Sequence, residues 1–166
     1  MVIRNLKDPR DQGAVYTDFL GKVTSVQFSP NGEFVASGDD AGKLKIWSYN
    51  SDTKVFTVKK EHTMLAGPVH TIAWTDDGVR ISAAGEGKDM LAKAVLAESG
   101  TKIGDLFGPT KTVMSMDIRP KPYRLVMCGE NQEVYVFDGA PFKHAKTLKD
   151  HTNFVNKVSF KPEGGA

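Results

Sequence analysis

The chain has 166 residues, of which 40% are hydrophobic and 25% charged, and its net charge is +2. This length suits one domain. Ordinary hydrophobicity with a small net charge excludes a disordered chain, and the charge balance gives no support to a nucleic-acid or membrane-surface role. The single cysteine, Cys128, excludes an internal disulfide and a cysteine-based metal site, and is typical of a reducing compartment.

No part of the sequence predicts a membrane span or a signal peptide. No stretch approaches the ~18–20 consecutive apolar residues that cross a bilayer. Arg4, Lys7 and Asp8 lie where a signal peptide would need an apolar core. We therefore expect a cytoplasmic protein with no membrane partner.

Three segments of the chain are similar to one another, and a fourth begins the same pattern. They start at valines that lie 46, 44 and 42 residues apart: Val23, Val69, Val113 and Val155. An alternating apolar pair follows in step, formed by Val26 and Phe28, Ile72 and Trp74, Met116 and Ile118, and Val158 and Phe160. A turn residue comes next in the same frame: Pro30, Asp76, Pro120 and Pro162.

The apolar period within each unit is two, which predicts β-strands and no helix. Each unit has room for four short strands separated by turn chemistry, and four antiparallel strands every ~40–45 residues are typical of a β-propeller blade. The sequence therefore predicts an all-β chain, a single incomplete β-propeller domain over residues 1–166. Its parts are about three full four-stranded blades over 23–58, 69–107 and 113–148, with strand remnants at 2–17 and 155–160.

The units resemble WD repeats. Trp47-Ser48, Ala97-Glu98 and Phe137-Asp138 occupy the place of the Trp-Asp dipeptide, and Asp150-His151 occupies that of the opening Gly-His. His151 is then expected to have a structural role at the edge of a blade.

Nearly the whole chain is similar to the N-terminal propeller of the actin-interacting protein 1 family. The similarity is carried by the segments Val2–Pro9, Val35–Trp47, Ile72–Asp89, Arg119–Leu125, Phe137–Lys143 and Asp150–Pro162. The resemblance implies a non-enzymatic, cytoskeleton-associated protein that binds actin filaments together with cofilin and promotes filament disassembly. A generic WD-repeat scaffold, or a truncated paralogue without actin activity, is the alternative.

The number of units departs from the family pattern of two seven-bladed propellers. Propellers close with ~4–8 blades, so three blades and remnants predict an open arc. Two bared blade faces would forfeit on the order of ten kcal/mol of burial, comparable to the whole stability of a domain. We expect a truncated protein, an incompletely predicted gene, or a chain completed by a partner, with self-association through open blade edges. A four-bladed ring closed by strand exchange would lack one strand.

The resemblance also implies a set of protein-binding residues: Asp89, Glu130, Lys143, His144 and Phe154. Asp89 ends the loop Gly85–Asp89, which is two to three residues longer than its counterparts and is either a solvated loop or part of a binding rim. His144 departs from the family, which prefers Phe there. Phe154 is expected either in the core or on the surface, whereas Phe142 is expected in the core.

Two further features have competing readings. The lysines Lys143, Lys146 and Lys149 either protect an edge strand or face an acidic partner. The segment Gly85–Lys88 is similar to a phosphate-binding loop but lacks the following Ser or Thr and a helix.

Catalysis finds little support in the sequence. The four histidines are spread over different strands and loops without metal-ligand spacing: His62, His70, His144 and His151. We therefore predict no catalytic residue, no metal and no cofactor.

Overall fold

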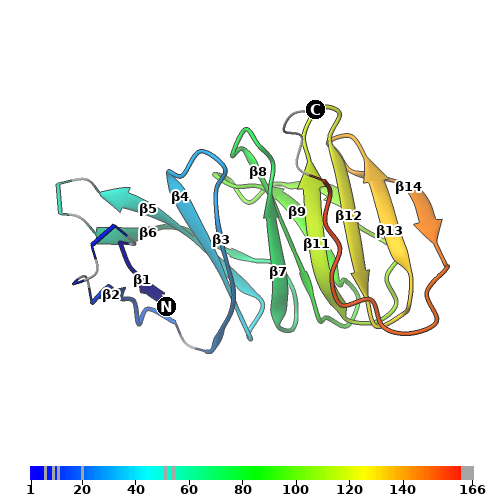
Figure 1. Ribbon diagram of the computed structural model, residues 1–166, viewed down its shortest axis with the longest axis horizontal. Helices are drawn as coiled ribbons and strands as arrows, with labels where there is room; N and C mark the ends of the chain where they lie inside the picture. The colour runs from blue at the N-terminus through cyan, green and yellow to red at the C-terminus, as the bar shows by residue number, and fades with distance from the viewer. Residues whose placement is uncertain are drawn as a thin grey trace.

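The computed structural model describes residues 1–161 except Leu6, Pro9, Asp11, Leu20, Ser51 and Lys54. These described residues form strands, turns and loops, with no helix, and hence none long and apolar enough to cross a membrane. The predicted all-β fold with four-stranded sheets is confirmed: three antiparallel four-stranded sheets lie side by side along an arc that is not closed (Figure 1).

The three sheets follow one another in the chain. The first contains β3 (Val23–Phe28), β4 (Phe34–Asp39), β5 (Lys43–Asn50) and β6 (Val55–Thr63). The second contains β7 (Val69–Trp74), β8 (Arg80–Gly85), β9 (Ala92–Leu96) and β10 (Lys102–Asp105). The third contains β11 (Val113–Arg119), β12 (Arg124–Gly129), β13 (Val134–Asp138) and β14 (Lys143–Leu148).

The predicted remnant 2–17 contains a short antiparallel pair, β1 (Val2–Ile3) with β2 (Ala14–Val15). Tyr16 and Phe19, just after this pair, place their rings 5.4 Å from that of Trp47 in β5. The remnant therefore covers part of the first sheet. Within 2–17, Leu6, Pro9 and Asp11 lie outside the described residues, as does Pro162 of the repeat frame.

The prediction of a strand over 155–160 is wrong. This segment has no strand partner among the described residues. The amide of Val158 donates to Ser115 Oγ at 3.3 Å, and that of Phe160 donates to Asp117 Oδ2 at 2.7 Å. The segment runs beside β11 (Figure 1) and bonds to its side chains, whereas a strand needs a backbone ladder.

Strand register also corrects the expected repeat alignment. Trp47 pairs with Val35, and Val95 pairs with Ile81, the counterpart of Val35 as the second residue of its strand. Val95, and not Ala97, therefore holds the place of Trp47 in the second sheet. The longer loop before β9 adds two positions, since Val95 follows Ile81 by 14 positions and Trp47 follows Val35 by 12, whereas Ala97 would require four added positions. Only in the first sheet does a tryptophan occupy this place, where Trp47 Nε1 donates to Ser37 Oγ at 2.8 Å.

Polar contacts between neighbouring sheets, which we call the inner ties, link the first strand of each sheet to the next unit. Thr24 Oγ1 donates to the Val69 carbonyl at 2.6 Å, and Thr71 Oγ1 accepts from the Met116 amide at 3.2 Å. The bonds from Val158 and Phe160 to β11 continue the series. The partners lie 43 to 45 residues apart in the chain, which is within the range of 42 to 46 residues between successive units.

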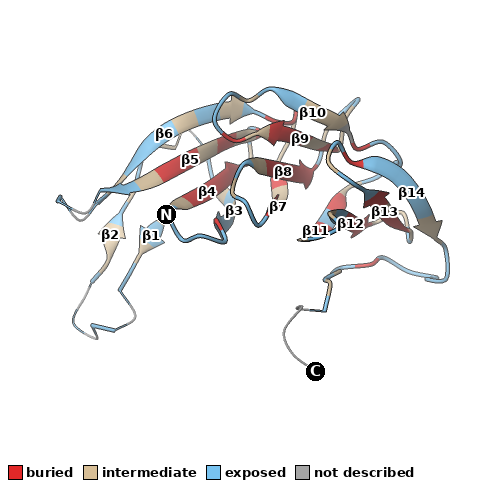
Figure 2. Ribbon diagram, turned by 90° about the horizontal axis from the view of Figure 1, so that it is seen from above, coloured by how far each residue is buried: buried red, intermediate tan, exposed pale blue. Residues whose placement is uncertain are grey.

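Apolar residues fill the two junctions between the sheets. Figure 2 shows that buried residues concentrate in the middle strands, while β6 and β14 are largely exposed. The first junction packs Leu44, Ile46 and Val69, among others, and the second packs Leu125 and Phe137. Burial of these side chains supplies the main stabilising contribution.

The strands of each sheet begin and end along two opposite sides of the sheet. We call these sides the connection edge and the turn edge, after the segments that they carry. The connection edge carries the loops 40–42, 86–91 and 130–133 and the links between sheets at 64–68, 106–112 and 149–154. The turn edge carries the turns 29–33, 75–79, 97–101, 120–123 and 139–142. The β8–β9 loop has six residues against three and four in its counterparts, as the sequence predicts.

Candidate functional site

One backbone contact recurs at the connection edge of every sheet. The amide after the second strand donates to the carbonyl just before the first strand: Asp40 to Lys22 at 3.0 Å, Glu86 to Pro68 at 2.9 Å, and Glu130 to Thr112 at 3.1 Å. The repeat therefore places an acidic residue at the same point of each sheet.

Glycines make this close approach possible in the second and third sheets. A Cβ on Gly85 would lie 2.0 Å from the Pro68 carbonyl oxygen, and one on Gly129 would lie 1.9 Å from that of Thr112. A side chain at either position would push the link away from the strand end. These glycines thus fix where Glu86 and Glu130 stand.

A hollow of about 540 Å³ lies at the connection edge between the second and third sheets. It is lined by 66–68, by part of the β8–β9 loop, by Thr110–Thr112 and by Glu130. Its charged lining residues are of both signs: Glu86, Lys88, Lys111 and Glu130. His70 Nε2 lies 3.0 Å from Glu86 Oε1, which orients this carboxylate. Charges of mixed sign on a rim favour a specific orientation of a partner.

A smaller hollow of about 140 Å³ adjoins it and is lined by Asp89 and Phe107 among others. Asp89 is exposed, and 60% of Phe107 is exposed. β10 ends at Asp105, two residues short of the predicted strand end, so Phe107 stands in a link and not in a sheet. The hollow combines a carboxylate with an accessible aromatic ring.

Phe154 lies at the connection edge of the third sheet. The amide of Val155 donates to the Gly129 carbonyl at 3.1 Å, which fixes this segment beside Glu130. The Phe154 amide is held by Asn153 Oδ1 at 2.8 Å, and 53% of the residue is exposed. Of its two expected locations, Phe154 has the surface one.

Lys143 and His144 lie at the turn edge, where β14 begins. Lys143 pairs with Asp138, while Leu148 at the other end of β14 pairs with Val134. Five residues at ~3.3 Å each separate Lys143 from the connection edge by about 16 Å. His144 places its ring 5.6 Å from that of Phe137.

The structure therefore divides the residues that the sequence grouped into one binding face. Asp89, Glu130 and Phe154 share the connection edge, whereas Lys143 and His144 do not. We call the set Glu86, Asp89, Phe107, Glu130 and Phe154 the connection-edge surface. Sequence reasoning missed Glu86 and Phe107: alignment of the residue after each second strand would have found the first, but nothing in the repeat marks the second.

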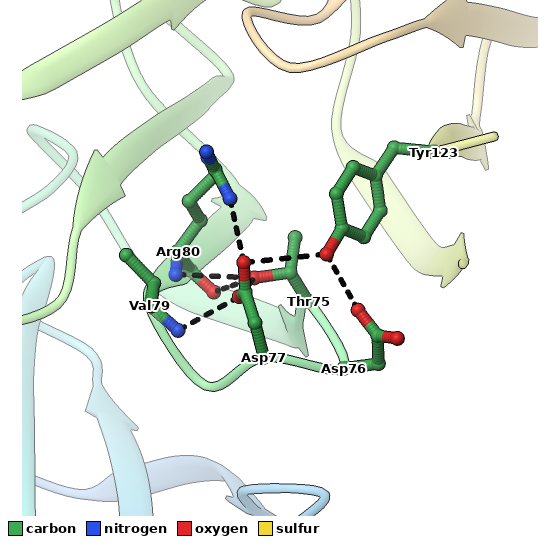
Figure 3. Close-up of polar contacts among 6 residues, drawn as sticks. All are labelled: Thr75, Asp76, Asp77, Val79, Arg80 and Tyr123. Atoms are coloured by element: carbon green, nitrogen blue, oxygen red, sulfur yellow. Dashed lines mark hydrogen bonds and ion pairs between the residues drawn. The ribbon is translucent and has the colours of Figure 1, made fainter. Parts of the chain in front are cut away.

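A second polar cluster crosses the turn edge between the second and third sheets (Figure 3). The Tyr123 hydroxyl donates to Asp76 Oδ1 at 2.6 Å and lies 3.2 Å from Asp77 Oδ2. The Arg80 guanidinium lies 5.7 Å from the centre of the Tyr123 ring and bonds Asp77 at 2.7 Å. The hydrogen bond to Asp76, with burial and the charges of both carboxylates, raises the pKa of Tyr123. Tyr123 therefore stays protonated and acts as a donor, not a base.

Asp77 lies at the centre of the turn 75–79, which contributes most residues of this cluster. Burial opposes its ionisation, but bonds from Thr75 Oγ1 at 2.5 Å and the Val79 amide at 2.9 Å outweigh it. Together with the charge of Arg80 they hold the pKa of Asp77 below its usual value. The cluster ties two sheets and keeps a charged carboxylate at their junction.

The described residues contain no group of three or more His, Cys, Asp or Glu side chains placed to share a metal ion. Cys128 is 1% exposed, and burial raises the pKa of its thiol to about 11. Phe142, predicted in the core, is 2% exposed.

Comparisons with known proteins agree with the repeat architecture. The family "WD domain, G-beta repeat" matches residues 13–48, which span β2 to β5. Residues 13–48 therefore form a WD repeat. Two solved structures have the same fold. The structure of U3-55K has a TM-score of 0.75 and 16% identity, and the match covers 86% of this chain and 44% of that one. The structure of the RRP9 WD40 repeats has a TM-score of 0.71 and 17% identity, and the match covers 86% of this chain and 43% of that one.

Sequence similarity to curated proteins covers almost the whole chain. The chain is 38% identical over 165 residues to actin-interacting protein 1 of Drosophila melanogaster and, over the same length, 38% identical to WD repeat-containing protein 1 of Gallus gallus. The protein of that name from Bos taurus is 37% identical. Each alignment takes in 99% of this chain and 27% of the relative, so the WD-repeat chain spans about a quarter of the relatives' length.

Proposed function

We propose that this WD-repeat chain is a non-enzymatic protein-binding scaffold that binds actin filaments together with cofilin and promotes filament disassembly. The observation that carries the proposal is the 38% identity, over 99% of the chain, to a relative named actin-interacting protein 1. Association with the actin cytoskeleton in the cytoplasm follows from the same proposal.

The connection-edge surface supports a binding role. It combines carboxylates at Glu86, Asp89 and Glu130 with the exposed rings of Phe107 and Phe154. Charged rim residues orient a partner, and aromatic side chains, phenylalanine included, are enriched in protein interfaces. The chemistry required is surface complementarity, with no bond made or broken.

Filament sedimentation tests the proposal. The 166-residue chain is mixed with actin filaments, with and without cofilin, and actin is measured in pellet and supernatant. We expect the chain to enter the pellet with cofilin-decorated filaments and to raise the soluble actin only when cofilin is present. A chain that stays in the supernatant, with soluble actin unchanged, would refute the proposal.

A WD-repeat scaffold without actin activity is the second candidate. It is favoured by His144, which stands where the related family has a phenylalanine and lies at the turn edge, away from the connection-edge surface. Sedimentation of a His144→Phe chain separates the two. Cofilin-dependent binding that appears only in this variant would favour the scaffold.

A further inference from the structure

The first strand of the first sheet, β3, differs from its counterparts β7 and β11 in what covers it. All three strands lie along the inner, concave side of the arc (Figure 2). β7 and β11 each have a four-stranded sheet before them, whereas no four-stranded sheet precedes β3 among the described residues. In the frame of the repeat, Val26 of β3 corresponds to Ile72 and Met116. Val26 is 44% exposed, but Ile72 is only 5% and Met116 only 4% exposed.

The next residue on the same side of β3 shows the same contrast. Side chains two positions apart in a strand share one face, so Phe28 lies beside Val26. Phe28 is 53% exposed, whereas its counterpart Trp74 is 6% exposed. The N-terminal remnant covers Trp47 in β5 of the same sheet, but it leaves these two residues of β3 in contact with solvent. β3 therefore carries an exposed apolar face that is buried in the equivalent strands.

The backbone of β3 is also unpaired along one side. Its sheet has the order β3-β4-β5-β6, so β3 pairs with β4 alone. β3 and β11 have the same register with their second strands, in which Val26 corresponds to Met116. The Met116 amide points away from its own sheet and donates to Thr71 Oγ1 at 3.2 Å. The N–H and C=O groups of Val26 therefore point to the free side of β3, where residues 25–28 line a hollow of about 550 Å³.

Charge distinguishes β3 from the outer edge strands. Each outer edge strand carries lysine: Lys59 and Lys60 in β6, Lys102 in β10, and Lys143 and Lys146 in β14. Charged residues on an edge strand oppose its pairing with another chain. The sequence of β3 is VTSVQF, which contains no charged residue. β3 therefore lacks the protection against strand addition that the outer edges have.

The sequence of β3 is complementary to itself in the antiparallel direction. A register centred on Val26 places the two copies of Val26 opposite each other, and places Ser25 of each copy opposite Gln27 of the other. Apolar groups then meet apolar groups, polar groups meet polar groups, and no like charges face each other. The N–H and C=O groups of the two Val26 residues can exchange a pair of hydrogen bonds. Self-complementarity of this kind is the requirement for a contact between two identical chains.

We propose that β3 pairs in the antiparallel direction with β3 of a second copy of this chain, in the register centred on Val26. The pairing joins the first sheets of the two copies into one continuous sheet and brings Val26 and Phe28 of both copies into one apolar patch. The free side of β3 faces the concave side of the arc, whereas the connection-edge surface lies at the ends of the strands. The proposal is therefore independent of filament binding.

Analytical ultracentrifugation of the 166-residue chain tests the self-association. We expect a reversible equilibrium between monomer and dimer with a midpoint below about 100 µM. No larger species should form, because a contact between identical surfaces closes at two copies. A chain that stays monomeric up to this concentration would overturn the proposal. Assembly beyond the dimer would also overturn it, because open-ended growth requires contact between two different surfaces.

A charge at position 26 tests the strand. Val26→Lys should weaken self-association by at least about tenfold, because the two introduced ammonium groups would face each other directly. Val58→Lys is the matched control, because Val58 lies in the edge strand β6 and is 40% exposed. Unchanged self-association in Val26→Lys, or an equal loss in Val58→Lys, would refute β3 as the interface.

Opposite charges at the same position test the register. Val26→Lys and Val26→Glu should each be monomeric alone, and an equimolar mixture of the two should form a heterodimer. This rescue requires that position 26 of one copy faces position 26 of the other. Circular dichroism melts verify that both variants fold. Two folded variants that remain monomeric when mixed would refute pairing centred on Val26.

Discussion

The Tyr123 hydroxyl and the Asp76 carboxylate meet at 2.6 Å across the junction of the second and third sheets. No turn or strand contains both residues, since 47 positions separate them in the chain. The bond can form only when the two sheets pack against each other, so its contribution to that packing can be measured by removing it.

Replacement of Tyr123 by phenylalanine should lower the free energy of unfolding by about 1 kcal/mol, since one partly exposed hydrogen bond is lost and the ring is kept. For a chain of this size that corresponds to about 2–4 °C in the melting temperature. Tyr49→Phe is the matched control, because Tyr49 is 49% exposed and its ring packs on Phe56. Equal melting temperatures for the two variants would contradict the role of the bond.

Acid should weaken the same junction. The pKa of Asp77 is lower in the folded chain than its usual value of about 3.9. The stabilisation from ionised Asp77 is therefore fully present above about pH 4 and is lost as the pH falls through the folded pKa. Urea unfolding between pH 6 and 3 should show a steeper loss of stability for the parent than for Asp77→Asn. Parallel profiles would reject this assignment.

The connection-edge surface should carry the binding of filaments. Phe154→Ala should weaken cofilin-dependent sedimentation by about tenfold, which corresponds to about 1.4 kcal/mol. Phe28→Ala is the control, because both phenylalanines are 53% exposed and Phe28 lies at the turn-edge end of β3. If both variants lose binding alike, the effect belongs to general surface hydrophobicity and not to this edge.

Charge at the same edge can be tested separately. Glu130→Gln should reduce binding in low salt more than in high salt, because screening already weakens the charge of the parent at high ionic strength. Glu33→Gln, an exposed acid in the turn 29–33, should bind as the parent does. A salt-independent loss in Glu130→Gln would show that its carboxylate acts by another route.

Alanine at the close-contact glycines should be poorly tolerated. A Cβ at Gly129 would lie 1.9 Å from a backbone oxygen, so Gly129→Ala must displace the link at Thr112. We expect a loss of about 1–3 kcal/mol in unfolding free energy. At Gly104 the nearest atom would lie at 3.4 Å, and Gly104→Ala should cost less than about 1 kcal/mol. Denaturant titration of both variants checks the difference.

Cys128 should report global unfolding. With a pKa of about 11, about a thousandth of its thiol is ionised at pH 8, and the residue is 1% exposed. Labelling by a thiol reagent should therefore be slow in the folded chain and fast in denaturant. Rapid labelling without denaturant would show that the third sheet opens locally.

The repeat predicted the strands because its signals are local. Alternation at Val23–Phe28 and turn residues at Ser29–Gly32 act within a few neighbours, so the strands of all three sheets follow from the sequence. The segment 155–160 has the same alternation yet forms no ladder, since a strand also needs a partner that alternation cannot supply. Self-association through open edges stays a prediction.

The candidate site was less predictable because it depends on which edge each residue reaches. Glu130 and Lys143 are 13 positions apart in the sequence, but one strand and two reversals place them at opposite edges of the sheet. The link between Tyr123 and Asp76 was equally hidden, because it joins turns of different units. Both the placement of these residues and this bond depend on how the strands and sheets are aligned with one another. The residue pattern within a single unit does not determine them.

The inner ties have a consequence for how the chain is made. Every tie joins a residue to one that is synthesised 43 to 45 positions later. A sheet that has just left the ribosome therefore lacks the hydrogen-bond partners of its first strand until the next unit emerges. Growth of the arc is directional, and each newly made unit completes the one before it.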